Sequence, residues 1–189
     1  GGPRPDTDTF TVTLTTGLGA ITAIRLDLLP DETLPKRGPG RADNGNVHLS
    51  EFVFQAFAPG ASRAEDIPMR HATSDFDQDG FDVGKAVDGD AKTSWAIHPD
   101  EGRPHHAVFE PASPVRMRPG FRLVVVLRQK QPGGHLIGRF RLSALNAPEA
   151  QPWALPAAAA AALETPAAGR TSLQRVALAA PIVRVTAER

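Results

Sequence analysis

Residues 121–130 read FRLVVVLRQK, and the unbroken apolar run from Leu123 to Leu127 is typical of a central strand covered on both faces. Residues 9–16 (TFTVTLTT) alternate apolar side chains with threonines, which is the pattern of a half-buried strand. No helical periodicity separates the strand segments before residue 150, so the sequence predicts an all-β fold, an antiparallel β-sandwich. The remaining strand segments are residues 21–29 (ITAIRLDLL), 47–57 (VHLSEFVFQAF), 105–110 (HHAVFE) and 138–145 (GRFRLSAL).

The composition excludes several classes of function. The chain has 189 residues, and its 21 Lys and Arg balance its 21 Asp and Glu, so the formal net charge is zero. A neutral chain without a basic run has no electrostatic attraction to nucleic acid or to an anionic membrane surface. The absence of cysteine excludes disulfides, thiolate zinc sites and a cysteine nucleophile. We therefore expect neither nucleic acid nor membrane among the partners.

The sequence predicts three regions: a disordered lead over residues 1–8, the β-sandwich over 9–147 and a helical appendage over 148–189. The composition changes after Pro148, where residues 154–164 (ALPAAAAAALE) have high helix propensity; a disordered tail is the alternative. Thr171 is followed by Gln174 three positions later, which predicts a capping box at the start of a second short helix.

The stretch DFDQDG, residues 75–80, starts like the calcium loop of an EF-hand. Its three alternating aspartates and its glycine match the first half of that loop. The position of the bidentate glutamate that closes an EF-hand is Ala86, and no amphipathic helix flanks the loop. We expect a solvated acidic turn here.

A second acidic turn lies in AVDGDAKTSWA, residues 86–96. Calcium takes about six to eight oxygen ligands, including carboxylates, hydroxyls and backbone carbonyls. Asp88, Asp90 and Thr93 offer such oxygens within one tight curl, and Trp95 would anchor the curl in the core. The alternative is an ordinary Asp-Gly turn without metal.

The same residues resemble the signature A-x-D-G-x-x-x-T-x-W of discoidin-type (coagulation factor 5/8 C-terminal) domains and of related galactose-binding-like carbohydrate-binding modules. The resemblance implies a structural calcium, bound by Asp88, Asp90 and Thr93 and completed by a glutamate from another strand. The matching glutamate is Glu51 in LSEFVF, residues 49–54, which here precedes the Asp-Gly segment and implies a permuted strand order. Glu51 would then lie beside Asp88.

A second resemblance covers nearly the whole chain. Long phrases such as GFDVGKAVDGDAKTSWAI are similar to a segment of planctomycete-type multidomain proteins that contain cytochrome c. This resemblance implies an extracytoplasmic location, periplasmic or at the cell surface, and a module that works beside redox domains of its parent. It does not name a ligand.

Histidines and arginines provide the residues for a ligand site. Sugar rings stack on aromatic faces, and arginines bind hydroxyls or carboxylates. The residues expected to line a sugar-binding cleft are Trp95, His98, Arg103, His105, Arg139 and Arg141; for Trp95 the alternative is a core position, and for the two strand arginines a solvated face. A metal site of His98, His105 and His106 is disfavoured, because neighbouring strand residues point to opposite faces.

The function expected from these patterns is non-catalytic: binding a carbohydrate, such as polysaccharide or another glycan, to hold a larger protein near its substrate, with a structural Ca²⁺. Two alternatives remain open at this stage. One is an interaction module that packs against neighbouring domains of the parent protein without binding sugar, and the other is a histidine-based metalloenzyme.

Overall fold

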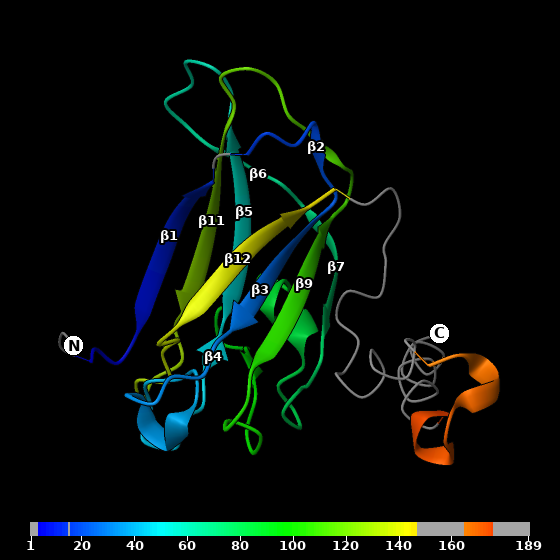
Figure 1. Cartoon of the computed structure of the whole chain (residues 1–189). Helices are drawn as coiled ribbons and strands as arrows, with labels where there is room; N and C mark the ends of the chain where they lie inside the picture. The colour runs from blue at the N-terminus through cyan, green and yellow to red at the C-terminus, as the bar shows by residue number, and fades with distance from the viewer. Residues whose placement is uncertain (1–3, 15, 147–164, 176–189) are drawn as a thin grey trace. The chain divides into compact units, whose positions relative to one another are not determined.

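The computed structural model describes residues 4–14, 16–146 and 165–175 (Figure 1). The chain divides into two compact units, Gly1–Gln151 and Pro152–Arg189. The first unit is built of strands in antiparallel sheets, which confirms the predicted all-β fold class. No helix among the described residues is long and apolar enough to cross a membrane.

Two four-stranded antiparallel sheets form the framework, with β11 at the interior position that its continuous apolar run predicts. Sheet A has the order β1 (Asp8–Leu14), β11 (Arg122–Gln129), β5 (Glu51–Phe57), β6 (Glu65–Asp66). Sheet B has the order β12 (Phe140–Leu145), β3 (Ala23–Leu28), β9 (His105–Pro111), β7 (Met69–Ser74). The short elements are β2 (Ala20–Ile21), β4 (His48–Leu49), β8 (Trp95–Ala96), β10 (Val115–Arg116) and the 3-10 turns η1 (Pro35–Arg37), η2 (Val83–Ala86) and η3 (Ala167–Gly169).

The facing sides of the two sheets share one hydrophobic core. Phe52 of β5 stacks on Phe109 of β9 with ring centroids 3.9 Å apart and an interplanar angle of 5°. Phe10 of β1 and Phe140 of β12 meet at 5.4 Å. In Figure 1 the strands β12, β3 and β9 cross in front of β11 and β5, so the arrangement is sandwich-like. This packing leaves the ends of the strands and the connecting loops to carry polar sites.

Residues 4–8, part of the segment expected to be a disordered lead, make contacts with the sandwich. Arg4 pairs with Asp43 at 2.7 Å, and the carbonyl of Asp6 accepts a hydrogen bond from the amide of Gly134. No strand was expected at β7, because MRHATS lacks a clean alternation and exposes two consecutive side chains.

In the second unit the predicted capping box is present. The backbone amide of Gln174 donates to Thr171 Oγ1 at 3.3 Å, and the backbone amide of Thr171 donates to Gln174 Oε1 at 2.9 Å. Residues 172–175 are helical, as the box predicts. The alanine-rich segment 154–164 lies outside the described residues.

Candidate functional site

The second acidic turn collects oxygen atoms around one threonine hydroxyl. Gly89 has a positive φ of 81°, which lets the chain reverse directly after Asp88. The carboxylate of Asp88 accepts the amide of Asp90 at 2.8 Å, and the carboxylate of Asp90 accepts the amide of Lys92 at 2.9 Å. These two bonds fix a compact curl between η2 and β8.

Thr93 Oγ1 lies at the centre of this curl, within hydrogen-bonding distance of three acceptors. They are Asp88 Oδ2 at 2.8 Å, the Asp90 carbonyl at 2.9 Å and the Lys85 carbonyl at 3.3 Å. A hydroxyl carries one proton, so it satisfies one of the three at a time. We call Lys85 O, the Asp88 carboxylate, Asp90 O and Thr93 Oγ1 the oxygen cluster. It has more acceptors than donors.

Glu51 brings a further carboxylate to the oxygen cluster from the start of β5. Its side chain is buried, with the residue 7% exposed, and Oε1 has no hydrogen-bond partner among the described residues. Burial raises the pKa of Glu51, and the nearby charge of Asp88 raises it further, while Arg128 and a backbone hydrogen bond from Gly89 act in the opposite direction. The structure therefore places Glu51 against the Asp-Gly turn, as the resemblance implies.

The oxygen cluster and Glu51 together are suited to binding a hard cation. The buried Oε1 of Glu51 costs free energy unless a cation or another donor satisfies it. Asp88 and Asp90 are exposed, so their oxygens are open to water or to a cation. Within residues 4–14, 16–146 and 165–175, no three His, Cys, Asp or Glu side chains form a metal-binding group. A site here would therefore depend on carbonyl and hydroxyl oxygens, which calcium accepts readily. Asp90 would contribute its carbonyl rather than its carboxylate.

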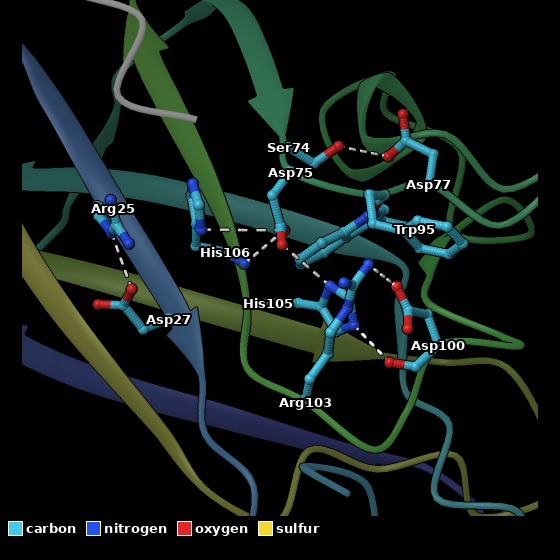
Figure 2. A network of polar contacts seen from close by, with 11 residues as sticks. Arg25, Asp27, Ser74, Asp75, Asp77, Trp95, Asp100, Arg103, His105 and His106 are labelled. Carbon is cyan, nitrogen blue, oxygen red and sulfur yellow. Dashed lines mark hydrogen bonds and ion pairs between the residues drawn. The ribbon is translucent and has the colours of Figure 1, made fainter. Parts of the chain in front are cut away.

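A second polar network surrounds Asp75, at the end of β7 (Figure 2). Asp75 Oδ2 lies 3.1 Å from His105 Nδ1, and Oδ1 accepts the His106 amide at 2.7 Å. His105 Nε2 lies 2.6 Å from the Asp100 carbonyl, which can only accept, so this nitrogen donates. The acidic stretch 75–80 thus serves, through its first residue, to tie β7 to β9.

Charge on both partners strengthens this tie. Burial alone would lower the pKa of His105, but its bonds to Asp75 and Asp100 outweigh burial and raise the pKa above the usual value. Burial likewise opposes ionisation of Asp75, but hydrogen bonds from His105 and His106 hold the pKa of Asp75 below its usual value. His105 and Asp75 therefore form an ion pair when His105 is protonated, and both imidazole nitrogens of His105 are engaged.

The structure corrects two of the six residues expected to line a sugar-binding cleft. Trp95 is 0% exposed, and its Nε1 donates to the Phe76 carbonyl at 3.0 Å, so its ring face cannot stack on a sugar. The side chain of His105 is also fully buried. Both side chains point into the core because β8 and the start of β9 are covered on that side.

The four other residues are exposed, but each is already paired with a carboxylate. His98 Nδ1 lies 2.6 Å from Glu101, and Arg103 pairs with Asp100 in the same loop. Arg139 bonds Asp31 at 3.2 Å, and Arg141 of β12 bonds Asp27 of β3 at 3.1 Å. These pairs lie on different elements and do not form one cleft.

The histidine metal site considered for the metalloenzyme is not assembled among the described residues. His105 points into the core, His106 lies on the outer side of sheet B, and His98 pairs with Glu101. Asp75, which lies between His105 and His106, comes from a position 30 residues upstream of His105, so no local motif could indicate the contact.

A further histidine, His48, lies in a contact that sequence spacing does not reveal. Its Nδ1 lies 2.8 Å from the buried Ser94 hydroxyl, and its ring centroid is 4.6 Å from that of His135. Burial, together with the neighbouring charge of His135, lowers the pKa of His48 to about 4. His48 is thus neutral at neutral pH.

We expect the imidazole of His48 to titrate near pH 4 in the native protein, measured from its C–H resonances by NMR. Because this folded-state pKa lies below the unfolded value, native stability falls as the pH drops from about 6.5 toward 4. A His135→Gln variant should move the pKa of His48 back toward its usual value. Titration of the wild-type His48 near pH 6.5 would contradict the assigned burial.

Comparisons of the chain with protein-family models, with curated proteins and with solved structures find no match.

Proposed function

We propose that this chain is a non-catalytic binding module, stapled by calcium, that holds a larger extracytoplasmic protein on polysaccharide. The observation that carries the proposal is the oxygen cluster beside Glu51, whose buried Oε1 has no hydrogen-bond partner among the described residues. A structural calcium at this turn is what the resemblance to discoidin-type and galactose-binding-like modules implies. In such a module the cation orders loops, and the binding surface depends on that order.

The Asp75–His105 pair argues against a catalytic role for His105 and so supports a binding function of the chain. A general base must reach a substrate proton, whereas His105 is buried and both of its nitrogens are already bonded. The network is a structural tie between β7, β9 and the loop that contains Asp100. Its polar groups hold the loops of the module in place.

The proposal predicts that the chain binds a defined polysaccharide in a glycan-array and pulldown screen at neutral pH. Because the cation orders loops, treatment with a calcium chelator should weaken binding by about tenfold or more, and added calcium should restore it. If the chain binds a glycan equally well with and without the chelator, glycan binding does not depend on the structural calcium. Absence of binding to every glycan in calcium would refute the carbohydrate function.

A second candidate function, an interaction module within the parent protein, is favoured by the open side of sheet A. Among the described residues, β1 pairs only with β11, so its other edge offers free backbone donors and acceptors. Phe10, Val12 and Leu14 on this strand are only half-buried. A neighbouring domain that adds a strand here should lose its association with a Thr11→Pro variant, measured by copurification of the two separately produced domains.

A further inference from the structure

A surface depression of about 670 Å³ lies at the β5–β6 edge of sheet A. A depression of this size suits one or two sugar units, since small-molecule sites span roughly 300–1,000 Å³. It contains none of the residues expected to bind sugar from the sequence. We call it the β5–β6 pocket, and its lining residues are Gln55, Arg63, Ala64, Glu65 and Asp66.

The walls of the β5–β6 pocket are held by backbone pairing. Gln55 pairs with Asp66, and Ala56 pairs with Glu65, in the antiparallel register of β5 and β6. Directly after β6, the amide of Ile67 donates to the Phe54 carbonyl at 2.8 Å, and the Ile67 side chain packs against the core. The connection between the strands is thus anchored at both ends, so the pocket is formed before any ligand arrives.

Gln55 and Asp66 present a pair of planar polar groups across the pocket. Gln55 Nε2 donates to Asp66 Oδ1 at 2.7 Å, which fixes both side chains and leaves the Gln55 carbonyl oxygen as an acceptor. Neither Arg63 nor Glu65 makes a side-chain hydrogen bond or an ion pair with another described residue, and both are exposed. These side chains can therefore bind a ligand without first breaking an ion pair.

The charge of the β5–β6 pocket selects among sugars. The lining contains two carboxylates, Glu65 and Asp66, and one guanidinium, Arg63, so its formal charge is negative and acceptors are abundant. Sugar hydroxyls can donate to such acceptors, whereas uronate or sulfate groups would be repelled by the carboxylates. The chemistry favours a neutral hexose over an acidic sugar.

Phe57 and Arg122 extend the same face of sheet A beside the pocket. Phe57 follows Gln55 by two positions, so both side chains point to one side of β5. The guanidinium carbon of Arg122 lies 4.3 Å from the centre of the Phe57 ring. Its N–H groups are further hydrogen-bond donors that a second sugar unit could meet.

We propose that the β5–β6 pocket is the polysaccharide-binding site and that it takes a neutral hexose unit. This inference rests on the proposed carbohydrate function and goes beyond it by naming the surface and the sugar class. It replaces the Trp95 and His98 region as the binding surface.

The test is a pulldown of the full 189-residue chain with insoluble mannan, β-glucan and starch, and with polygalacturonate as the acidic probe, all in calcium. Wild type should be retained by at least one neutral polysaccharide and not by polygalacturonate. Asp66→Ala and Gln55→Ala should weaken that binding by about tenfold or more. Glu65→Lys is a further test variant. Because Glu65 is exposed, this substitution disturbs no packing.

His98→Ala and Arg103→Ala, in the exposed loop, are the matched controls and should bind like wild type. The melting temperature of each variant shows that it folds. Wild-type affinity in the pocket variants, or a preference for polygalacturonate, would overturn the pocket while leaving the carbohydrate function in place. Retention of wild type by none of the probes would overturn both.

Discussion

Calcium added to the chelator-treated protein at neutral pH is expected to raise its melting temperature by about 5–10 °C. A ligand that binds only the native state adds about 2.7 kcal/mol at a concentration of 100 times its dissociation constant. For a domain of this size each kcal/mol shifts the melting temperature by about 2–4 °C. Thermal unfolding followed by circular dichroism, with and without chelator, measures the shift.

The difference in stability between Glu51→Gln and wild type should change sign when calcium is added. Without calcium, the variant should be at least as stable as wild type, because it removes a buried carboxylate that Asp88 and Asp90 repel. With calcium, wild type should be the more stable of the two, since the variant lacks an anionic ligand. Asp79→Asn, at an exposed position in the neighbouring turn, removes the same charge and should still respond to calcium like wild type.

The calcium effect should also depend on pH in one direction. The raised pKa of Glu51 means that protons compete with the cation above the usual range of a glutamate. Lowering the pH through that raised pKa should therefore shrink the calcium-dependent shift in melting temperature. A shift of the same size in acid, or an equal response of Glu51→Gln, would exclude Glu51 from the site.

The largest loss of stability without any metal is expected from Asp75→Ala, about 3–5 kcal/mol, because it leaves His105 buried without its counter-ion. Urea denaturation measures it. His98, which is exposed and pairs with the half-buried Glu101, provides the control, and His98→Ala should cost about 0.5 kcal/mol or less.

The dependence of folding stability on pH distinguishes a contribution of this ion pair from one of apolar packing. The lowered pKa of Asp75 contributes stability above the usual aspartate value of about 3.9, which is lost as the pH falls through the folded-state value. The raised pKa of His105 contributes stability below the usual histidine value of about 6.5, which is lost as the pH rises through the folded-state value. The pair should thus contribute most to stability between these limits, and Asp75→Asn should remove this contribution from the profile. An unchanged profile would contradict the ion pair.

Local periodicity predicted the long strands of this fold because burial on one or both faces sets their pattern directly. The run from Leu123 to Leu127 marked the interior strand, and the alternation of residues 9–16 marked the edge strand beside it. Periodicity could not find β7, whose side chains are mostly half-exposed, or the polar contacts that join distant segments.

The residues of the candidate site also divide into those that the sequence could predict and those that it could not. Glu51 could be identified from the sequence because the motif of the Asp-Gly turn is completed by a glutamate from another strand. Trp95 had two expected places, an anchor in the core and a wall of the cleft, since an aromatic residue after a turn has the same signal in both. Its burial and the bond from Nε1 to Phe76 place it in the core. The β5–β6 pocket depends on the pairing of two strands and has no signature in either segment.

The pairing of β1 with β11 also determines when the fold can be completed. Phe10 lies opposite Leu127, 117 residues later in the chain, so this contact closes a very long loop. During synthesis at about 5–20 residues per second, β1 therefore waits about 6–23 seconds for its partner. Until then its threonine-rich, apolar edge is available to other chains, and newly made protein is most prone to aggregate in that interval.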